Sequence, residues 1–116
     1  MCAIPFAFSA CERAAPEVPA GLLTSRQAQE AGSAIFAANC AICHGVRGDG
    51  HGLRREGMTP PPANLTLLTW SDPTRASRVY QAIRNGISGT AMTSWPTLSD
   101  PEVWNVVSYI YSLRSV

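Results

Sequence analysis

The sequence has no lysine, no internal repeat, no long apolar run and no run that alternates as β-strands do. No stretch approaches the roughly 18 apolar residues of a membrane-spanning helix, so we expect the folded part to be soluble. The nine basic residues, all arginine, are balanced by eight acidic residues, and the net charge of +1 argues against nucleic acid as a partner. The absence of a repeat argues against a solenoid, and the absence of alternation predicts an all-helical fold.

The stretch that carries chemistry is Cys40-Ala41-Ile42-Cys43-His44. Two thiols three positions apart, with a histidine directly after the second, form the attachment pattern of c-type haem. Each thiol adds to one of two vinyl groups on neighbouring pyrroles, and His44 then lies under the iron as the proximal ligand. Its other ring nitrogen must donate a hydrogen bond that orients the ring. The pattern therefore predicts one covalently bound haem c.

Two other interpretations of the cysteine pair are weaker. A zinc site needs two further ligands at motif spacing, and only Cys2, Cys11 and His51 remain. A thioredoxin-like disulfide needs a strand before the pair, whereas residues 32–39 carry a helical pattern. A haem also suits the size of the chain, because 116 residues form one domain with a modest core, to which a large cofactor adds apolar mass.

Three segments carry the signals of helices, separated by loops of similar length. The first begins at a predicted capping box, Thr24 with Gln27, and runs to the haem motif, with Ala28, Ala31, Gly32, Ile35 and Phe36 on its apolar face. The second lies between Ser71-Asp72-Pro73 and the Asn85-Gly86 stop. Its inward residues are expected to be Val79, Ala82 and Ile83, and its water-facing residues Arg75, Arg78 and Arg84.

The third helix begins at the capping box Ser99-Asp100-Pro101-Glu102. One apolar face follows, made of Val103, Val106, Val107, Ile110 and Leu113. Glycines and three consecutive prolines exclude long regular elements between residues 45 and 65. We expect this loop to wrap a cofactor edge.

The sixth position on the iron has three candidate ligands. Met92 is favoured, because it lies in an irregular segment between two helices, where a flexible thioether can reach the iron. Met58, in the Gly/Pro loop, and His51, expected to be an exposed loop histidine, are its competitors. Trp95 follows Met92 closely; its indole N–H is a candidate donor to a haem propionate, and simple core filling is the alternative.

Residues 1–11 are small and apolar but lack the basic residues that begin a complete export signal. We interpret residues 1–23 as a leader remnant followed by a flexible tether. Phe8-Ser9-Ala10-Cys11 resembles a bacterial lipoprotein box with phenylalanine in place of the usual leucine, which makes Cys11 a candidate lipid-attachment site. A Cys2 to Cys11 disulfide, or two free thiols, are the alternatives.

From Thr24 onward the chain resembles the class I cytochromes c, which are small monohaem electron carriers. The resemblance covers residues 24–116 and implies three main helices and long loops around one haem. It places Gly32 and Phe36 against Val106, Tyr109 and Ile110 of the terminal helix, and it matches Gly89-Thr90-Ala91-Met92 to the segment that bears the methionine ligand. In the matching Pro62-Ala63-Asn64-Leu65 it assigns the Pro62 carbonyl as acceptor of the His44 hydrogen bond. Thr93 departs from the family, in which proline often follows the ligand.

This ligand set implies a single-electron carrier and not an enzyme, because histidine and methionine leave no open iron position. The expected partners are a redox donor and a redox acceptor, docked transiently, with Arg47, Arg54 and Arg55 as candidates for steering acidic surfaces. A haem subunit of a larger membrane-bound oxidoreductase and a haem-based ligand sensor are the alternatives. The family implies haem attachment outside the cytoplasm, so we expect a periplasmic protein or one on the outer face of the inner membrane. The lipoprotein-like box makes Cys11 the candidate membrane tether.

Overall fold

A computed structural model describes residues 16–67 and 74–113, and over these residues the chain forms helices and no β-strand. The elements are η2 (Leu22–Thr24), α2 (Arg26–Asn39), α3 (Ala41–His44), α4 (Thr74–Asn85) and α5 (Asp100–Ser112). The all-helical prediction is confirmed. None of the helices in the described ranges has both the length and the apolar character needed to cross a membrane. Cys2, Cys11 and Ser71-Asp72-Pro73 lie outside the described residues.

Helix α2 begins one residue later than predicted. Its N-cap is Ser25, whose hydroxyl accepts a hydrogen bond from the backbone nitrogen of Ala28 at 3.1 Å. Thr24 instead ends the η2 turn, and its hydroxyl donates back to the Gly21 carbonyl at 3.4 Å. The predicted capping box at Thr24 is therefore wrong, because a 3-10 turn already uses that residue when the helix starts.

Residues that precede Thr24 pack onto helices α4 and α5. Leu22 is buried, and its carbonyl accepts a hydrogen bond of 2.6 Å from the hydroxyl of Ser108, which is itself fully buried in α5. Ser77 of α4 donates to the Pro16 carbonyl at 2.6 Å. Pro16 and Leu22 both belong to the stretch that we interpret as leader and tether (residues 1–23), and these two bonds connect them to α4 and α5.

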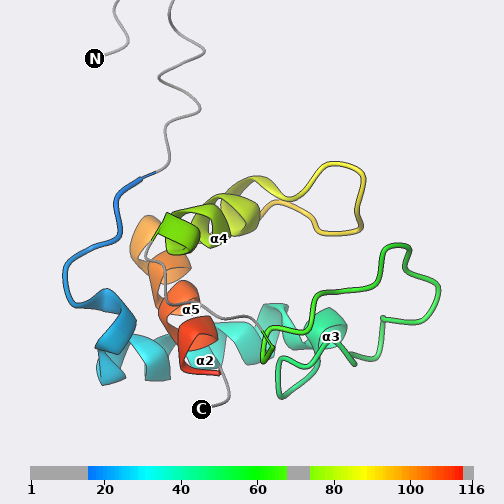
Figure 1. Cartoon of the computed structure of the whole chain (residues 1–116), viewed down its shortest axis with the longest axis horizontal. Helices are drawn as coiled ribbons and strands as arrows, with labels where there is room; N and C mark the ends of the chain where they lie inside the picture. Colours follow the sequence, from blue (N-terminus) through cyan, green and yellow to red (C-terminus); the bar gives the residue numbers. More distant parts are fainter. Residues whose placement is uncertain (1–15, 68–73, 114–116) are drawn as a thin grey trace, which may run out of the picture.

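Helices α2 and α5 cross at close range (Figure 1). A side-chain carbon at Gly32 would lie 1.9 Å from the backbone oxygen of Asn105, so only glycine fits at the crossing. One turn later Phe36 is fully buried, with its ring 5.1 Å from that of Tyr109. The predicted packing role of Gly32 and Phe36 is confirmed. Ala31, predicted on the same face, is exposed, because the buried seam follows Ala28, Gly32 and Phe36 at four-residue spacing.

Helix α5 forms the centre of the core. The Ser99 and Glu102 capping box is present as predicted, with bonds of 2.8 and 3.2 Å. Of its five predicted inward residues, Val103, Val106, Val107 and Ile110 are buried and Leu113 is half-buried. Helix α4 contributes Ala76, Tyr80 and Ile83 to the same core.

The prediction that Arg84 faces water is wrong. Its guanidinium bonds to two backbone carbonyls and to Asp100, and only 21% of the side chain is exposed. The last turn of α4 is therefore tied to the start of α5.

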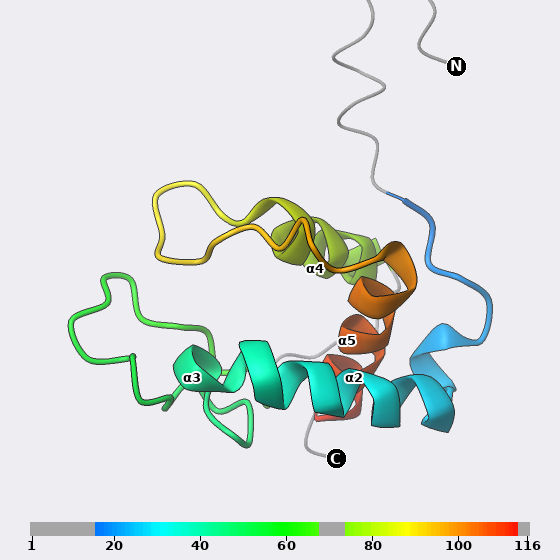
Figure 2. The same ribbon diagram turned by 180° about the vertical axis from the view of Figure 1, so that it is seen from behind.

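Two long loops leave the helices on the same side of the molecule (Figures 1 and 2). The Gly/Pro loop (residues 45–67) follows α3, and the Met92 loop (residues 86–98) joins α4 to α5. The α2–α5 crossing fixes the helices from which both loops start.

Replacing Gly32 by alanine tests the crossing. At an open helix position this change stabilises by about 0.5–1 kcal/mol. Here we expect the opposite sign, a loss of about 1–3 kcal/mol, because the methyl group meets the Asn105 backbone. Denaturant unfolding of the haem-loaded protein measures it. Ala31→Val, which adds bulk at an exposed position of the same helix, should stay within about 0.5 kcal/mol; a stabilising Gly32→Ala would contradict the packing.

Candidate haem site

Two adjoining pockets lie between the loops and the helices. The loop pocket, about 300 Å³, is bounded by the haem motif, the prolines of the Gly/Pro loop and the Met92 loop. The helix pocket, about 290 Å³, is bounded by residues of α2, α4 and α5, most of them apolar. Five residues line both pockets, namely Cys40, His44, Ala63, Ile87 and Met92. The two therefore form one continuous site of the size typical of cofactor cavities.

The single turn of α3 presents the haem motif to this cavity. Cys40 ends α2, and the His44 backbone nitrogen bonds to its carbonyl at 2.9 Å, so both thiols fall on the side that lines the loop pocket. The cysteines are not joined in a disulfide. Burial, followed by the proximity of Cys43, raises the pKa of the Cys40 thiol to about 11. In the described part of the chain no three His, Cys, Asp or Glu side chains gather as a metal ion held by such ligands would need.

The His44 ring is oriented by a backbone carbonyl. Its Nδ1 lies 3.1 Å from the Ala63 oxygen. Because a carbonyl only accepts, Nδ1 carries the proton and Nε2 keeps its lone pair for a metal. The prediction that the Pro62 carbonyl plays this role is wrong; Pro62 lines the loop pocket, and its carbonyl oxygen lies near Gly50, 2.9 Å from where a side-chain carbon would be.

Backbone bonds fasten the Gly/Pro loop to α3. The nitrogens of Gly50, Gly52 and Arg54 donate to the carbonyls of His44, Cys43 and Ile42 at 2.7, 3.1 and 2.8 Å. Leu65 donates to the Gly48 carbonyl at 2.7 Å, which brings Ala63 beside the histidine. A side-chain carbon at Gly52 would lie 2.4 Å from the Ile42 oxygen and 2.5 Å from the Cys43 carbonyl carbon. Glycine is therefore required where the loop passes the motif.

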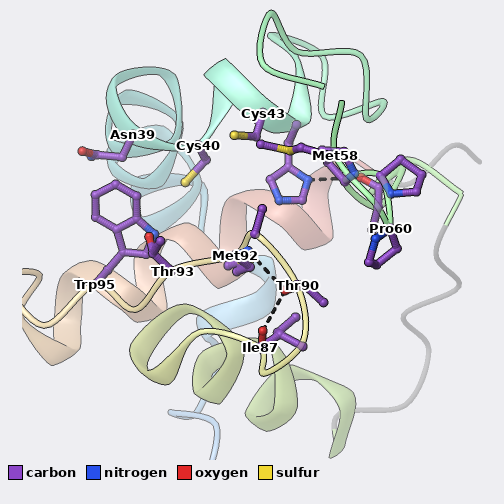
Figure 3. Close-up of a pocket in the computed structure, with 15 residues that line it drawn as sticks. Asn39, Cys40, Cys43, Met58, Pro60, Ile87, Thr90, Met92, Thr93 and Trp95 are labelled. Carbon is purple, nitrogen blue, oxygen red and sulfur yellow. Dashed lines mark hydrogen bonds between the residues drawn. The ribbon is translucent and has the colours of Figure 1, made fainter. Parts of the chain in front are cut away.

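The two candidate methionines lie on different walls. Figure 3 shows Met92 on the Met92 loop, across the cavity from Cys40 and Cys43, and Met58 beside Pro60 on the side of Cys43. Met92 lines both pockets, whereas Met58 lines the loop pocket and a shallow outer pocket with His51. Only Met92 therefore faces the histidine-bearing wall from the opposite side of the whole cavity.

Of the other residues considered from the sequence, Trp95 and Thr93 line the cavity and His51 does not. Trp95 and Thr93 line the loop pocket, and the Trp95 backbone nitrogen donates to the Ile83 carbonyl at 3.0 Å. His51 has 66% of its side chain exposed and bonds to the Asp49 carbonyl, away from the two pockets.

Sequence reasoning missed several lining residues. Ile87 lines both pockets, and its position directly after the Gly86 stop was the available signal. Arg75 and Arg78, predicted to face water, are exposed but also line the mouth of the helix pocket beside Val79 and Ala82. Hydrophobic periodicity predicts residues that pack on other side chains. It does not identify residues that line a pocket for a cofactor.

Comparison with known proteins identifies the fold. The family described as cytochrome c oxidase, cbb3-type, subunit III matches residues 27–110. The chain belongs to this family of cytochrome c domains. The fold resembles one chain of the Kuenenia stuttgartiensis reducing HAO-like protein complex, with a TM-score of 0.70 and 27% identity over 95% of this chain and 56% of that one. The predicted resemblance to cytochromes c is confirmed.

Individual relatives of this cytochrome c domain fall into two groups. Subunit FixP of the Azorhizobium caulinodans cbb3-type oxidase is 34% identical over 87 residues, 74% of this chain and 27% of that protein. Subunit CcoP of Rhodobacter capsulatus is 36% identical over 91 residues, 72% of this chain and 28% of that protein. Cytochrome c-554(547) of Halothiobacillus neapolitanus is 26% identical over 86 residues, 72% of this chain and 94% of that protein. The chain thus spans about a quarter of the oxidase subunits it matches.

The cavity fits the cofactor that the family implies. A covalent haem c requires two thiols and a nitrogen ligand on one wall, and Cys40, Cys43 and His44 are together there. The opposite and inner walls supply a thioether and apolar side chains. The protein is therefore a cytochrome c electron-transfer domain, and the domain is not itself catalytic.

Replacing Gly52 by alanine tests the fastening of the loop. The added methyl group meets the backbone of Ile42 and Cys43, so the motif must shift. We expect a loss of about 1–3 kcal/mol in unfolding free energy and a smaller haem-loaded fraction of purified protein. Leu53→Ala is the control, because Leu53 is 94% exposed next to it. Equal haem loading and stability in both variants would show that the motif does not depend on this contact.

Proposed function

We propose that the protein carries single electrons by means of one haem c that Cys40 and Cys43 bind through thioether bonds and that His44 and Met92 ligate. The observation that carries the proposal is the opposition of Met92 to the Cys-x-x-Cys-His turn across one apolar cavity. When bound, the haem supplies a one-electron iron couple.

The side chains determine how that couple behaves. His44 is held by the Ala63 carbonyl, which makes Nε2 the ligand nitrogen and strengthens its basicity. The Met92 thioether favours ferrous iron and raises the reduction potential. A haem held by both His44 and Met92 would offer small molecules no open site on the iron, which is what a carrier needs. Trp95 lines the cavity together with Thr93, which supports a role for its indole N–H as donor to a haem propionate.

Redox partners are expected to dock transiently near the cavity mouth. Arg47, Arg54 and Arg55 are exposed on the Gly/Pro loop and supply positive charge for an acidic partner. The family implies maturation outside the cytoplasm, which supports a periplasmic location, and Cys11 is the proposed lipid anchor.

A second function is favoured by the comparisons. Two relatives are subunits of cbb3-type oxidases. In such an assembly the same cavity would serve a dedicated haem subunit that delivers electrons to its own oxidoreductase. The match to cytochrome c-554(547) covers 94% of that protein, and this relative supports the free carrier. Co-purification of the protein with a membrane oxidoreductase from its own host distinguishes the two.

Met92→Leu tests the axial ligand and thereby the function. Loss of the thioether should lower the midpoint potential by on the order of 0.1 V, a fraction of the roughly 0.8 V range set by axial ligands. The reduced variant should bind carbon monoxide rapidly, whereas wild type should not. An optical redox titration and a carbon monoxide titration measure both effects.

Met58→Leu is the matched control and should behave as wild type in both titrations. If Met58→Leu lowers the potential and opens the iron instead, the assignment of Met92 is wrong. Rapid carbon monoxide binding by the wild type would favour a ligand sensor over a carrier.

Intact-mass analysis tests the covalent attachment. Protein matured in a host competent for haem c should carry the mass of one haem, and this mass should survive denaturation in acid. Cys40→Ala and Cys43→Ala should each keep at most one thioether link, while Met58→Leu should match wild type. Wild-type protein at the bare chain mass would contradict the proposal.

A further inference from the structure

We infer that Arg84 is a positioning residue that holds the Met92 loop closed over the cavity, an inference that rests on the proposed ligand role of Met92. Arg84 lies in the last turn of α4. Its Nη1 donates to the Trp95 carbonyl at 2.9 Å and to the Leu98 carbonyl at 2.7 Å. Its Nη2 donates to Asp100 Oδ1 at 2.7 Å. One guanidinium thus joins α4, the second half of the Met92 loop and the first residue of α5.

The other bonds of the loop do not replace this clamp. Met92 is fixed to the first half of the loop, because its nitrogen bonds to Thr90 Oγ1 at 3.1 Å and its carbonyl accepts from Ile87 at 3.3 Å. These bonds hold the tip of the loop to itself. Among the described residues, the hydrogen bonds from the second half of the loop to α4 are the Trp95 to Ile83 backbone bond and the two carbonyl contacts of Arg84.

The Arg84 side chain is itself held in place. Asp100 Oδ1 also accepts a bond of 2.6 Å from the Tyr80 hydroxyl. The Arg84 guanidinium carbon lies 5.8 Å from the centre of the Tyr80 ring, and that ring packs 4.5 Å from Trp104 in the core. The Tyr80 hydroxyl, followed by the guanidinium, holds the pKa of the Asp100 carboxyl below its usual value. The Arg84 guanidinium is therefore already oriented for its hydrogen bonds to the two loop carbonyls.

Only arginine fits this arrangement. A planar guanidinium presents several N–H groups in a fixed fork, so it serves two carbonyls and a carboxylate at once. A lysine ammonium keeps the charge but has a single nitrogen and no fixed directions. Loss of the clamp should raise the fraction of molecules in which the loop is open and Met92 is away from the iron. An external ligand then binds more tightly, in proportion to that fraction.

The experiment titrates the oxidised, haem-loaded protein with imidazole and follows ligand exchange in the optical spectrum. Arg84→Lys should bind imidazole about tenfold more tightly than wild type, as expected for the loss of one charge-assisted hydrogen bond. Asp100→Ala leaves the carbonyl contacts but frees the guanidinium, so it should shift affinity in the same direction by a smaller factor. Met92→Leu gives the limit in which the ligand is absent.

Ser108→Ala is the control for general destabilisation. It removes a buried hydrogen bond of α5 to the Leu22 carbonyl, outside the Met92 loop. Denaturant unfolding measures its stability loss beside that of Arg84→Lys. Its imidazole affinity should stay within about twofold of wild type, because global unfolding is too rare to open the iron.

Three outcomes would overturn the inference. In the first, Arg84→Lys keeps wild-type affinity while Met92→Leu binds tightly, which leaves the proposed function intact. In the second, Ser108→Ala gains as much affinity as Arg84→Lys for an equal loss of stability. In the third, Arg84→Lys takes up no haem and Asp100→Ala has unchanged affinity. Unchanged affinity in Met92→Leu would instead refute the ligand assignment on which the inference rests.

Discussion

The backbone contact between Gly32 and Asn105 sets the geometry on which the site depends. Helix α2 leads directly into the Cys-x-x-Cys-His turn, and helix α5 receives the end of the Met92 loop. With no side chain at the crossing, the two helices approach until backbone meets backbone. The wall that bears the cysteines and the wall that bears Met92 are therefore placed relative to each other by a steric limit, which tolerates little variation.

The two walls are fastened by different means. The Gly/Pro loop is bound to α3 by backbone hydrogen bonds to the carbonyls of residues 42–44. Its register therefore depends little on side chains, although it requires that Gly52 has none. Among the described residues, the second half of the Met92 loop is hydrogen-bonded to α4 by the Trp95 to Ile83 backbone bond and by the side chain of Arg84. This difference matches the chemistry of the proposed ligands, since thioether links to Cys40 and Cys43 are permanent and the Met92 to iron bond is reversible.

Local signals in the sequence were sufficient for the haem motif, the all-helical fold and the Gly32 crossing. The motif is a fixed spacing, and the capping box at Ser99 is a four-residue pattern, so neither needs knowledge of distant residues. The start of α2 was misplaced because Thr24 and Ser25 are both good caps, and the choice depends on the 3-10 turn before them.

Contacts between residues distant in sequence could not be predicted in this way. Arg84 looked like a water-facing arginine, because its partners are carbonyls 11 and 14 residues later that any sequence would supply. The same limit explains the histidine acceptor. From the sequence, the carbonyl of either Pro62 or Ala63 could accept the bond from His44. In the structure the backbone bond from Leu65 to Gly48, which no side-chain pattern predicts, brings Ala63 beside the ring. In this protein the residues proposed to bind the cofactor are evident from sequence, whereas the groups that orient them are backbone atoms, whose roles are set by tertiary structure.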